Sequence, residues 1–374
     1  MILEITLFRG FPEDNRLSMD IYADGLRRAL QASCSERCRV FEYRPSLLPW
    51  PRFARGSRGP LRMRLSRFAA YPCQALQQRG KINHIVEQGY GHLLYVVNPQ
   101  RTVVTVHDLI PLLSWRGQIP AMQTRRKPWL SLFSFHALKR AAHLIAVSEN
   151  TRRDLIQHCG CAADRITVIH NGIDPIFRPY SAEERGIACH SWNLPADGIR
   201  RVLVTGHQTY KNLSGALQAF ARLQELYVGE LQLIKTGPAT SEWLRVVEAL
   251  NLKATTISLG FVPRSLLPDL FNIADCLLFP SFYEGFGCPP LEAMACGTPV
   301  VTSNAGSLPE VVADAGIMLD PQDHEGLAQA MYSVLTRDDL RSSLIERGLA
   351  RARQFTWEKA AQKTLEVYER IARR

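Results

Sequence analysis

The stretch SFYEGFGCPPLEAMACGTPVV, residues 281–301, combines two glutamates, several Gly and Pro residues and a short apolar segment. The preceding residues, ADCLLFPS, predict an apolar strand, and PPLEAMAC predicts a short helix that ends at Gly297. Proline is tolerated in a first helical turn because the amides there have no intrahelical acceptor. Glu284 therefore falls in a loop after a strand, and Glu292 falls inside the next helix. This order is typical of a parallel α/β sheet.

The same alternation of apolar strands and amphipathic helices continues along the whole chain. Strand-like runs in the first half are ILEITLF, VFEY, HIVE, TVVTVHD, LIAVS and ITVIH, and in the second half RVLVTG, LQLIKTG, TTISLGF, ADCLLFP, TPVVTS and AGIMLD. A chain of 374 residues is long enough for two domains. We predict an α/β protein with two Rossmann-like, doubly wound domains that face a central cleft, where such sheets bind ligands.

An irregular segment, HNGIDPIFRPYSAEERG, interrupts this alternation at residues 170–186. Its Asn-Gly turn and two prolines favour a domain junction. The sequence thus predicts an N-terminal domain over residues 1–178 and a C-terminal domain over residues 179–374. The last segment, FTWEKAAQKTLEVYERIARR, predicts a long amphipathic helix over residues 355–374, which could pack back on the first domain.

Composition narrows the class of protein. The chain is 46% hydrophobic and 21% charged, which is ordinary for a globular protein and argues against disorder. No apolar run reaches the roughly 18 to 20 residues of a spanning helix, and the N-terminus, with Glu4, predicts a strand rather than a signal peptide. The nine cysteines lack matched metal-ligand spacing, so we expect reduced thiols in a cytoplasmic protein.

The positive charge is concentrated in the first half of the chain. Residues 1–178 hold 26 Lys and Arg against 13 Asp and Glu, and no acidic residue lies between Tyr43 and Val86. Arginines interleaved with aromatic residues in this stretch suit an anionic membrane surface or a polyprenyl-diphosphate acceptor. A solvated loop without a partner is the alternative; nucleic acid is disfavoured because no binding motif accompanies the charge. The arginines assigned to this role are Arg52, Arg55, Arg58, Arg62, Arg64 and Arg67.

The glycine-rich loop could bind an anion, because glycines permit close approach of the backbone and helix-start amides favour negative charge. Pro289 and Pro290 have no N–H, so a phosphate would use amides of Gly285–Cys288 or of Leu291 and Glu292. The two glutamates are separated by seven residues and do not share a helix face, so we expect them to contact different parts of one ligand. The alternative is that Glu292 is an ordinary helix residue.

The string EGFGCPPLEAMACGTPVV resembles the E-x7-E signature of family 4 of the retaining glycosyltransferases, in the form found in bacterial mannosyltransferase-like members. Other segments resemble the same family in the same order: TVHDLIPLL (105–113), LIAVSENTRRDL (144–155), VIHNGIDPIF (168–177), VTGHQTYKNLSGALQAF (204–220) and AGSLPEVVADAGIMLDP. The resemblance implies the GT-B fold, in which the C-terminal domain holds a nucleotide sugar and the N-terminal domain holds the acceptor.

The resemblance also implies roles for individual residues. Glu284 would hydrogen-bond the transferred sugar, and Glu292 the ribose of the nucleotide. Lys211 would neutralise the diphosphate, whose charge grows as it leaves. His107 would line the cleft beside the sugar. The implied transfer is front-side and retaining, with the departing phosphate assisting deprotonation of the acceptor and with neither a protein nucleophile nor a metal cofactor.

The full set of residues expected to bind the donor is Gly206, His207, Lys211, Lys235, Glu284, Gly285, Phe286, Gly287, Cys288, Leu291 and Glu292. The chain departs from the family pattern in two places. His207 stands where the family usually has an arginine, with Lys235 as a possible helper, and only Gly10 remains of a glycine pair after the first strand.

Some of these residues also have a structural alternative. His107 could be a strand-end residue tied to Asp108, and Lys211 a surface lysine at a helix start. Ser307 and Glu310 form an S-x-x-E pattern that predicts a capping box, with Glu310 a weak candidate for the donor side.

These observations predict an enzyme that moves a hexose from a nucleotide sugar onto a lipid-linked or envelope glycan at the inner face of the cytoplasmic membrane. Mannose from GDP-mannose is the first candidate for the donor. UDP- and dTDP-sugars stay open as donors. The rival functions are a soluble transferase with a small acceptor and a catalytically inactive binding subunit of a polysaccharide assembly machine.

Overall fold

The computed structural model describes residues 2–14, 17–49, 59–78, 80–122, 124, 126–195 and 198–373. The chain divides into two compact units. The first comprises Met1–Arg116, Thr124–Gly172 and Thr356–Arg374, and the second comprises Gly117–Gln123 and Ile173–Phe355. The chain passes from one unit to the other at Gly172, before residue 178, and the last helix belongs to the first unit.

The first unit contains a parallel sheet whose described strands follow the order β2-β1-β3-β4-β5-β6. This order changes direction between β1 and β3, as in doubly wound folds. The strands are β1 (Leu3–Phe8), β2 (Cys38–Tyr43), β3 (Ile82–Ile85), β4 (Thr102–Val106), β5 (His143–Ala146) and β6 (Ile166–Val168). Strands β3 to β5 are buried along their whole length, and Val and Ile are frequent in them, although β3 also buries Asn83 and His84.

The second unit contains a parallel sheet with the described order β12-β11-β10-β7-β8-β9. Here the order reverses between β7 and β10, which makes it the Rossmann order. The strands are β7 (Ile199–Thr205), β8 (Glu230–Thr236), β9 (Thr256–Ser258), β10 (Cys276–Phe279), β11 (Val300–Ser303) and β12 (Ile317–Leu319). The predicted fold class of two Rossmann-like α/β domains is therefore confirmed.

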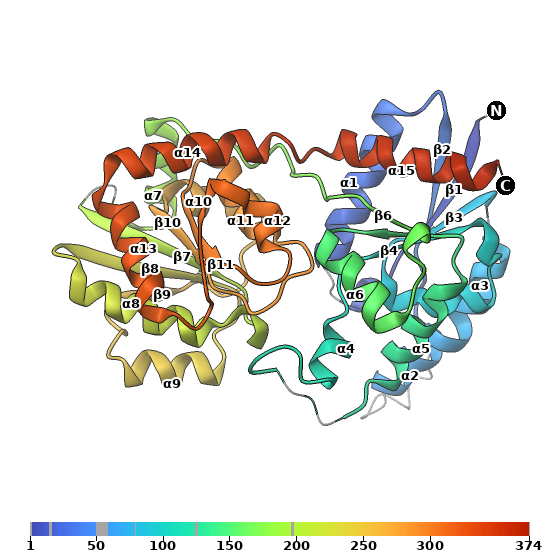
Figure 1. The fold of residues 1–374 in the computed structure, drawn as a ribbon, viewed down its shortest axis with the longest axis horizontal. Helices are drawn as coiled ribbons and strands as arrows, with labels where there is room; N and C mark the ends of the chain where they lie inside the picture. The colour runs from blue at the N-terminus through green and yellow to red at the C-terminus, as the bar shows by residue number, and fades with distance from the viewer. Residues whose placement is uncertain are drawn as a thin grey trace. The chain divides into compact units, whose positions relative to one another are not determined.

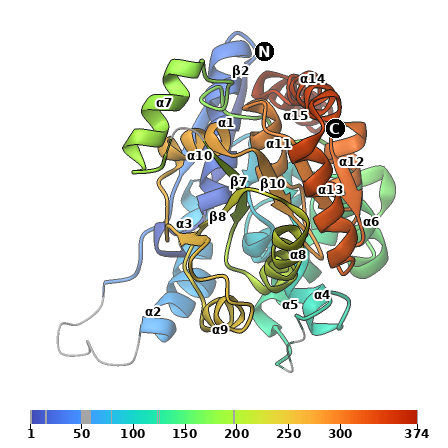
Figure 2. The same cartoon turned by 90° about the vertical axis from the view of Figure 1, so that its left-hand side faces the viewer.

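Helices flank both sheets (Figure 1). In the first unit they are α1 (Leu17–Ser33), α2 (Gly59–Leu65), α3 (Tyr71–Gln77), α4 (Ile110–Trp115), α5 (Trp129–Ala137), α6 (Glu149–Cys159) and α15 (Trp357–Ala372). In the second they are α7 (Ala182–Ser191), α8 (Leu213–Leu226), α9 (Ser241–Ala249), α10 (Leu267–Ile273), α11 (Cys288–Ala295), α12 (Leu308–Val312), α13 (His324–Thr336) and α14 (Asp338–Ala352). Helices α8 and α13 pack against each other, as Figure 2 also shows.

The last helix, α15, packs against α1 in the first unit (Figure 1). Its buried residues recur at helical spacing, beginning with Trp357. The indole of Trp357 lies against two glycines, because a Cβ on Gly25 would come within 2.6 Å of Trp357 Cδ2 and one on Gly172 within 2.6 Å of Trp357 Cγ. Glycine at both positions makes room for the indole. Because Trp357 is the first residue of α15, this packing attaches the last helix to the first unit.

A buried chain of polar side chains connects α15 to the first sheet. His84 Nδ1 lies 2.5 Å from the hydroxyl of Tyr368, and His84 Nε2 lies 2.8 Å from Thr105 Oγ1. Thr105 Oγ1 is also 2.9 Å from the hydroxyl of Tyr22 on α1. Burial lowers the pKa of His84 to about 3, so the imidazole is neutral at physiological pH.

Two further features concern the whole described chain. None of its helices has the length and apolarity needed to span a bilayer. The nine cysteines, all within the described ranges, form no disulfide.

Replacing Gly25 by Ala should destabilise the first unit, because the new methyl group collides with Trp357. Overpacking a core costs about 1–3 kcal/mol, more than the gain of up to about 1 kcal/mol from helix propensity. We expect a calorimetric Tm lower by about 2–8 °C. Gly186→Ala is the matched control, since Gly186 is an exposed helical glycine with open space around it. Equal melting of the two variants would contradict this packing.

Candidate functional site

The loops after β7 and β10 meet at the point where the order of the second sheet reverses. After β7 the chain turns at Gly206 (φ +98°) and enters a short 3-10 helix, Thr209–Lys211. After β10 it continues into the loop that contains Glu284. The amide of Phe282 donates to the carbonyl oxygen of Tyr210 (2.8 Å), which joins the two loops. Such a point at the carboxyl ends of parallel strands is the usual ligand site of this fold.

An ion pair lies at this junction. Lys211 Nζ donates to Glu284 Oε1 at 2.7 Å, and the two side chains are only 11% and 9% exposed. The ammonium also lies 4.5 Å from the ring centroid of Phe279 at the end of β10. Burying both charges costs solvation free energy that their mutual attraction must offset. The structure thus brings together two of the residues that the sequence predicts as catalytic.

Ser307 holds the loop that carries Glu284. Its hydroxyl donates to the carbonyl oxygens of Glu284 (3.1 Å) and Phe286 (2.7 Å). A Cβ on the neighbouring Gly306 would lie 2.7 Å from the amide nitrogen of Glu284, so only glycine fits there. The predicted capping box is wrong, because the Ser307 side chain makes no cap hydrogen bond to α12. The hydroxyl is directed at the loop carbonyls instead of at its own helix.

The remainder of the predicted donor loop leads into α11. Gly287 takes φ +99° at the N-cap of this helix, and Cys288 is its first residue. Leu291 is buried within the helix at 1% exposure, where its side chain belongs to the core. The loop Gly285–Gly287 thus leads directly into α11, the helix that carries Glu292.

The second glutamate, Glu292, is also buried and also paired with a cation. Arg264 NH1 donates to Glu292 Oε1 at 2.8 Å, and the guanidinium carbon lies 4.9 Å from the ring centroid of Phe177. Burial raises the pKa of Glu292 above its usual range, and the charge of Arg264 opposes that rise. The sequence analysis missed Arg264, since nothing in VPRSLLPDL distinguishes it from a surface arginine.

Lys235 is fully buried beneath the Gly206 turn. Its three N–H groups are shared among the carbonyl oxygens of Gly206 (3.1 Å), Thr236 (3.3 Å), Gly237 (2.8 Å) and Pro238 (3.0 Å). Burial lowers its pKa to about 8. These contacts stabilise two glycine turns at the ends of β7 and β8; the phosphate contact expected of Lys235 stays a prediction. His207, in contrast, is exposed beside the turn.

His107 is placed at the carboxyl end of β4 in the first unit. Its Nε2 lies 2.9 Å from the carbonyl oxygen of Val86, and its backbone amide donates to Gln88 Oε1 at 3.0 Å. Because a carbonyl oxygen only accepts, Nε2 carries the proton. Asp108 accepts a hydrogen bond from the amide of Ile110 (3.0 Å). The structure describes His107 within the first unit and the Lys211–Glu284 pair within the second.

The predicted arginine cluster is described only in part, because Arg52, Arg55 and Arg58 lie outside the described residues. Arg62 Nε donates to the carbonyl oxygen of Leu48 (2.8 Å), and Arg64 is exposed. Arg67 is tied to its own unit, since NH1 contacts an Asp14 carboxylate oxygen at 3.1 Å and NH2 donates to Gly89 O at 2.7 Å.

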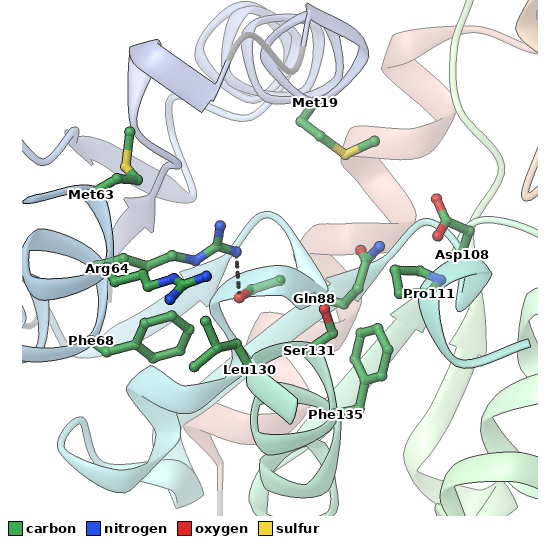
Figure 3. Close-up of a pocket in the computed structure, with 12 residues that line it drawn as sticks. Met19, Met63, Arg64, Phe68, Gln88, Asp108, Pro111, Leu130, Ser131 and Phe135 are labelled. Atoms are coloured by element: carbon green, nitrogen blue, oxygen red, sulfur yellow. Dashed lines mark hydrogen bonds between the residues drawn. The ribbon is translucent and has the colours of Figure 1, made fainter. Parts of the chain in front are cut away.

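A pocket of about 280 Å³ opens in the first unit near the end of β4 (Figure 3). Asp108, Gln88 and Ser131 supply polar atoms, whereas Phe68 and Phe135 supply apolar walls. The residues come from α1, the helical segment from α2 through residue 70, the segment after β3, and helices α4 and α5. A wall of aromatic rings with hydrogen-bonding groups beside it suits a sugar or another amphipathic molecule.

No group of three or more His, Cys, Asp or Glu side chains in the described ranges is arranged to hold a metal ion. The site of the second unit is instead built from two carboxylates, each beside a cation.

Two Rossmann-like domains in one chain are the architecture of the GT-B class of glycosyltransferases. Family models agree: "Glycosyltransferase Family 4" matches residues 18–177, and "Glycosyl transferases group 1" matches residues 193–351. The chain belongs to the glycosyltransferases of family 4, which have the GT-B fold.

Curated relatives include mannosyltransferases. O-antigen chain mannosyltransferase B of Escherichia coli is 34% identical over 274 residues, which cover 72% of this chain and 70% of that protein. The serotype-specific mannosyltransferase WbdA of Escherichia coli is 30% identical over 280 residues, covering 73% of this chain but 34% of the relative. Among solved structures, Anabaena HepE in complex with UDP and glucose superposes with a TM-score of 0.77 at 18% identity, covering 98% of this chain and 99% of that one.

Removing Arg264 tests the electrostatics of Glu292. In Arg264→Met the pKa of Glu292 should rise further, so ionising this carboxyl costs more folding free energy as the pH increases. Because removing one partner of a buried pair costs about 3–5 kcal/mol, we expect a deficit of about 3 kcal/mol at pH 8 and a smaller one at pH 5. Urea denaturation at both pH values measures it.

Arg222→Met is the control for this measurement, since its partner Glu225 is exposed and such pairs are worth about 0–1 kcal/mol. A deficit in Arg264→Met that does not change with pH would show that Glu292 is not the group responsible.

Proposed function

We propose that this glycosyltransferase is metal-independent and retaining, and that it transfers a hexose from a nucleotide sugar to a lipid-linked or envelope glycan. The observation that carries the proposal is the buried ion pair between Lys211 and Glu284 at the reversal of the second sheet. The ammonium and the carboxylate hydrogen-bond each other in this structure. Two adjacent groups of opposite charge are suited to bind two neighbouring parts of one donor.

Donor binding would replace the contact between Lys211 and Glu284 by one contact from each residue to the donor. A diphosphate attracts Lys211, because a doubly charged phosphate chain offers more negative charge than one carboxylate. Glu284 is then released to accept hydrogen bonds from sugar hydroxyls, and Glu292, held by Arg264 at 2.8 Å, faces the ribose end. The Gly206 turn and the Gly285–Cys288 loop would contact the diphosphate between them.

The chemical step follows from this arrangement. The bond between the sugar C1 and the diphosphate oxygen breaks while the acceptor oxygen bonds to C1 on the same face. The acceptor proton passes to the departing phosphate, so no protein nucleophile takes part. Lys211 stabilises the leaving group, whose charge grows in the transition state, and His107 would line the sugar side.

Mannose from GDP-mannose is the first donor to test, because two relatives are named mannosyltransferases. A UDP- or dTDP-sugar is the alternative, and the HepE structure contains UDP and glucose. For the acceptor we propose a glycan precursor at the inner face of the cytoplasmic membrane, bound at the pocket of the first unit with Asp108 and Gln88 as hydroxyl partners. A soluble transferase with a small acceptor is the rival.

A catalytically inactive binding subunit is the remaining alternative. Its support is His207 in place of an arginine and the single Gly10 after the first strand. Slow hydrolysis of nucleotide sugars by the purified chain separates the two functions, since a binding subunit without a catalytic site produces none.

Calorimetric titration with GDP-, UDP- and dTDP-sugars should identify one donor nucleotide. Lys211→Met should weaken binding of that nucleoside diphosphate by about 10- to 100-fold, because a hydrogen bond to a charged group contributes about 1.5–3 kcal/mol. The exposed Lys253→Met is the control and should bind as the wild type does. If no nucleotide sugar binds or is hydrolysed, and Glu284→Ala changes nothing in vivo, the proposal is rejected.

Transfer should persist after extensive treatment with EDTA, because Lys211 supplies the positive charge that a metal would otherwise supply. The anomeric configuration of the new linkage, measured by NMR coupling constants, should equal that of the donor. Loss of activity that Mg²⁺ or Mn²⁺ restores would exclude metal independence, and an inverted product would exclude retention.

A further inference from the structure

An exposed apolar cluster lies on α5, which the sequence analysis did not single out. Trp129 is 68% exposed, Phe133 48% and Leu130 44%. Trp129 and Phe133 are four residues apart, so they lie on one face of the helix. Phe135, on the opposite side of α5, is buried. Scattered apolar residues on a surface are ordinary, but a contiguous cluster indicates an interaction site.

Cations surround this cluster. A groove of about 480 Å³ between α4 and α5 is lined by Trp115, Trp129 and Phe133 together with Arg116, Lys127 and Lys139, and none of its described lining residues is Asp or Glu.

Lysine and arginine lie directly over the aromatic rings of this surface. Lys127 Nζ is 4.0 Å from the Trp129 ring centroid and 5.2 Å from that of Trp115. Tyr95 stacks on Phe133 with centroids 4.9 Å apart, and the guanidinium of Arg140 lies 5.2 Å from the Tyr95 centroid. Aromatic side chains with neighbouring lysines and arginines anchor proteins in the headgroup region of a bilayer.

The sequence around α5 has one sign of charge. Between Asp108 and Glu149 there are six Lys and Arg residues and no Asp or Glu. A surface of this kind attracts an anionic partner and repels a second copy of itself. A glycan is a poorer fit, because sugar hydroxyls are usually held by carboxylates and amides, whereas the charged side chains in the groove are cations.

We propose that the α4–α5 surface docks the chain on an anionic phospholipid bilayer, with Trp129 and Phe133 inserted among the headgroups and the cations of the groove on lipid phosphates. This surface is distinct from the arginine stretch before residue 68, and docking through it does not depend on the identity of the transferred sugar. It does bear on the acceptor, since Leu130 and Ser131 of the same helix line the pocket of Figure 3. Docking through α5 brings that pocket to the bilayer surface.

Sedimentation with vesicles tests the proposal on the full chain. Wild type should bind phosphatidylcholine vesicles that contain phosphatidylglycerol and should not bind pure phosphatidylcholine. The double variant Trp129→Ser/Phe133→Ser and the charge variant Lys127→Glu/Lys139→Glu should each lower the vesicle partition coefficient by about tenfold or more. The fluorescence of Trp129 should shift to the blue on binding.

Ile187→Ser/Leu244→Ser is the matched control, because both residues are exposed apolar side chains of helices in the second unit, 61% and 56% exposed. It should bind vesicles as the wild type does. Binding of a nucleotide sugar should be unchanged in all three variants, which shows that each is folded and keeps this test separate from that of the donor site.

Three results would overturn the proposal. They are no binding of wild type to anionic vesicles, equal binding by the α5 variants, or a dimer in sedimentation velocity that the α5 substitutions dissociate.

Discussion

A buried ion pair between Lys211 and Glu284 links the loop after β7 to the loop after β10, and the geometry of the candidate site depends on it. Each charge would be costly to bury alone, so each fixes the position of the other. The surrounding residues then serve to hold the two loops: Lys235 binds the carbonyl oxygen of Gly206, and Ser307 binds that of Glu284. A site assembled this way keeps its cation and its carboxylate at hydrogen-bonding distance before any ligand arrives.

The strands could be predicted because parallel strands covered on both faces are rich in apolar and β-branched residues, as CLLF in β10 and TVVTV in β4 show. The loops were predictable where backbone chemistry is restrictive, as in the helix start at Gly287 and its two prolines. Ser307 could not be assigned correctly, because a serine three residues before a glutamate has the same pattern whether its hydroxyl caps a helix or holds a loop from another strand. The partner that decides this lies more than twenty residues away in sequence.

Two lysines illustrate the same limit for charge. The sequence treats Lys211 and Lys235 alike, as cations near a glycine after a strand. In the fold, Lys211 faces a carboxylate, whereas Lys235 is enclosed by four carbonyl oxygens that compensate its burial. The difference follows from position, because Lys235 lies within β8, whereas Lys211 ends the 3-10 helix that follows the Gly206 turn. The sequence analysis missed Arg264 because Glu292 was identified from its own motif, which does not contain the cation that pairs with it.

The two buried carboxylates also bear on the choice between an active transferase and an inactive subunit. An ion pair in a protein interior is weak support for stability, since apolar residues of similar volume often stabilise as well or better. Burial is the largest cause of the raised pKa of Glu292, so keeping this carboxyl charged in the fold costs free energy. Two buried cation–carboxylate pairs that cost free energy favour the proposed binding of a charged, hydroxyl-bearing ligand. A nucleotide sugar has that combination, with hydroxyls at both ends and a diphosphate between them.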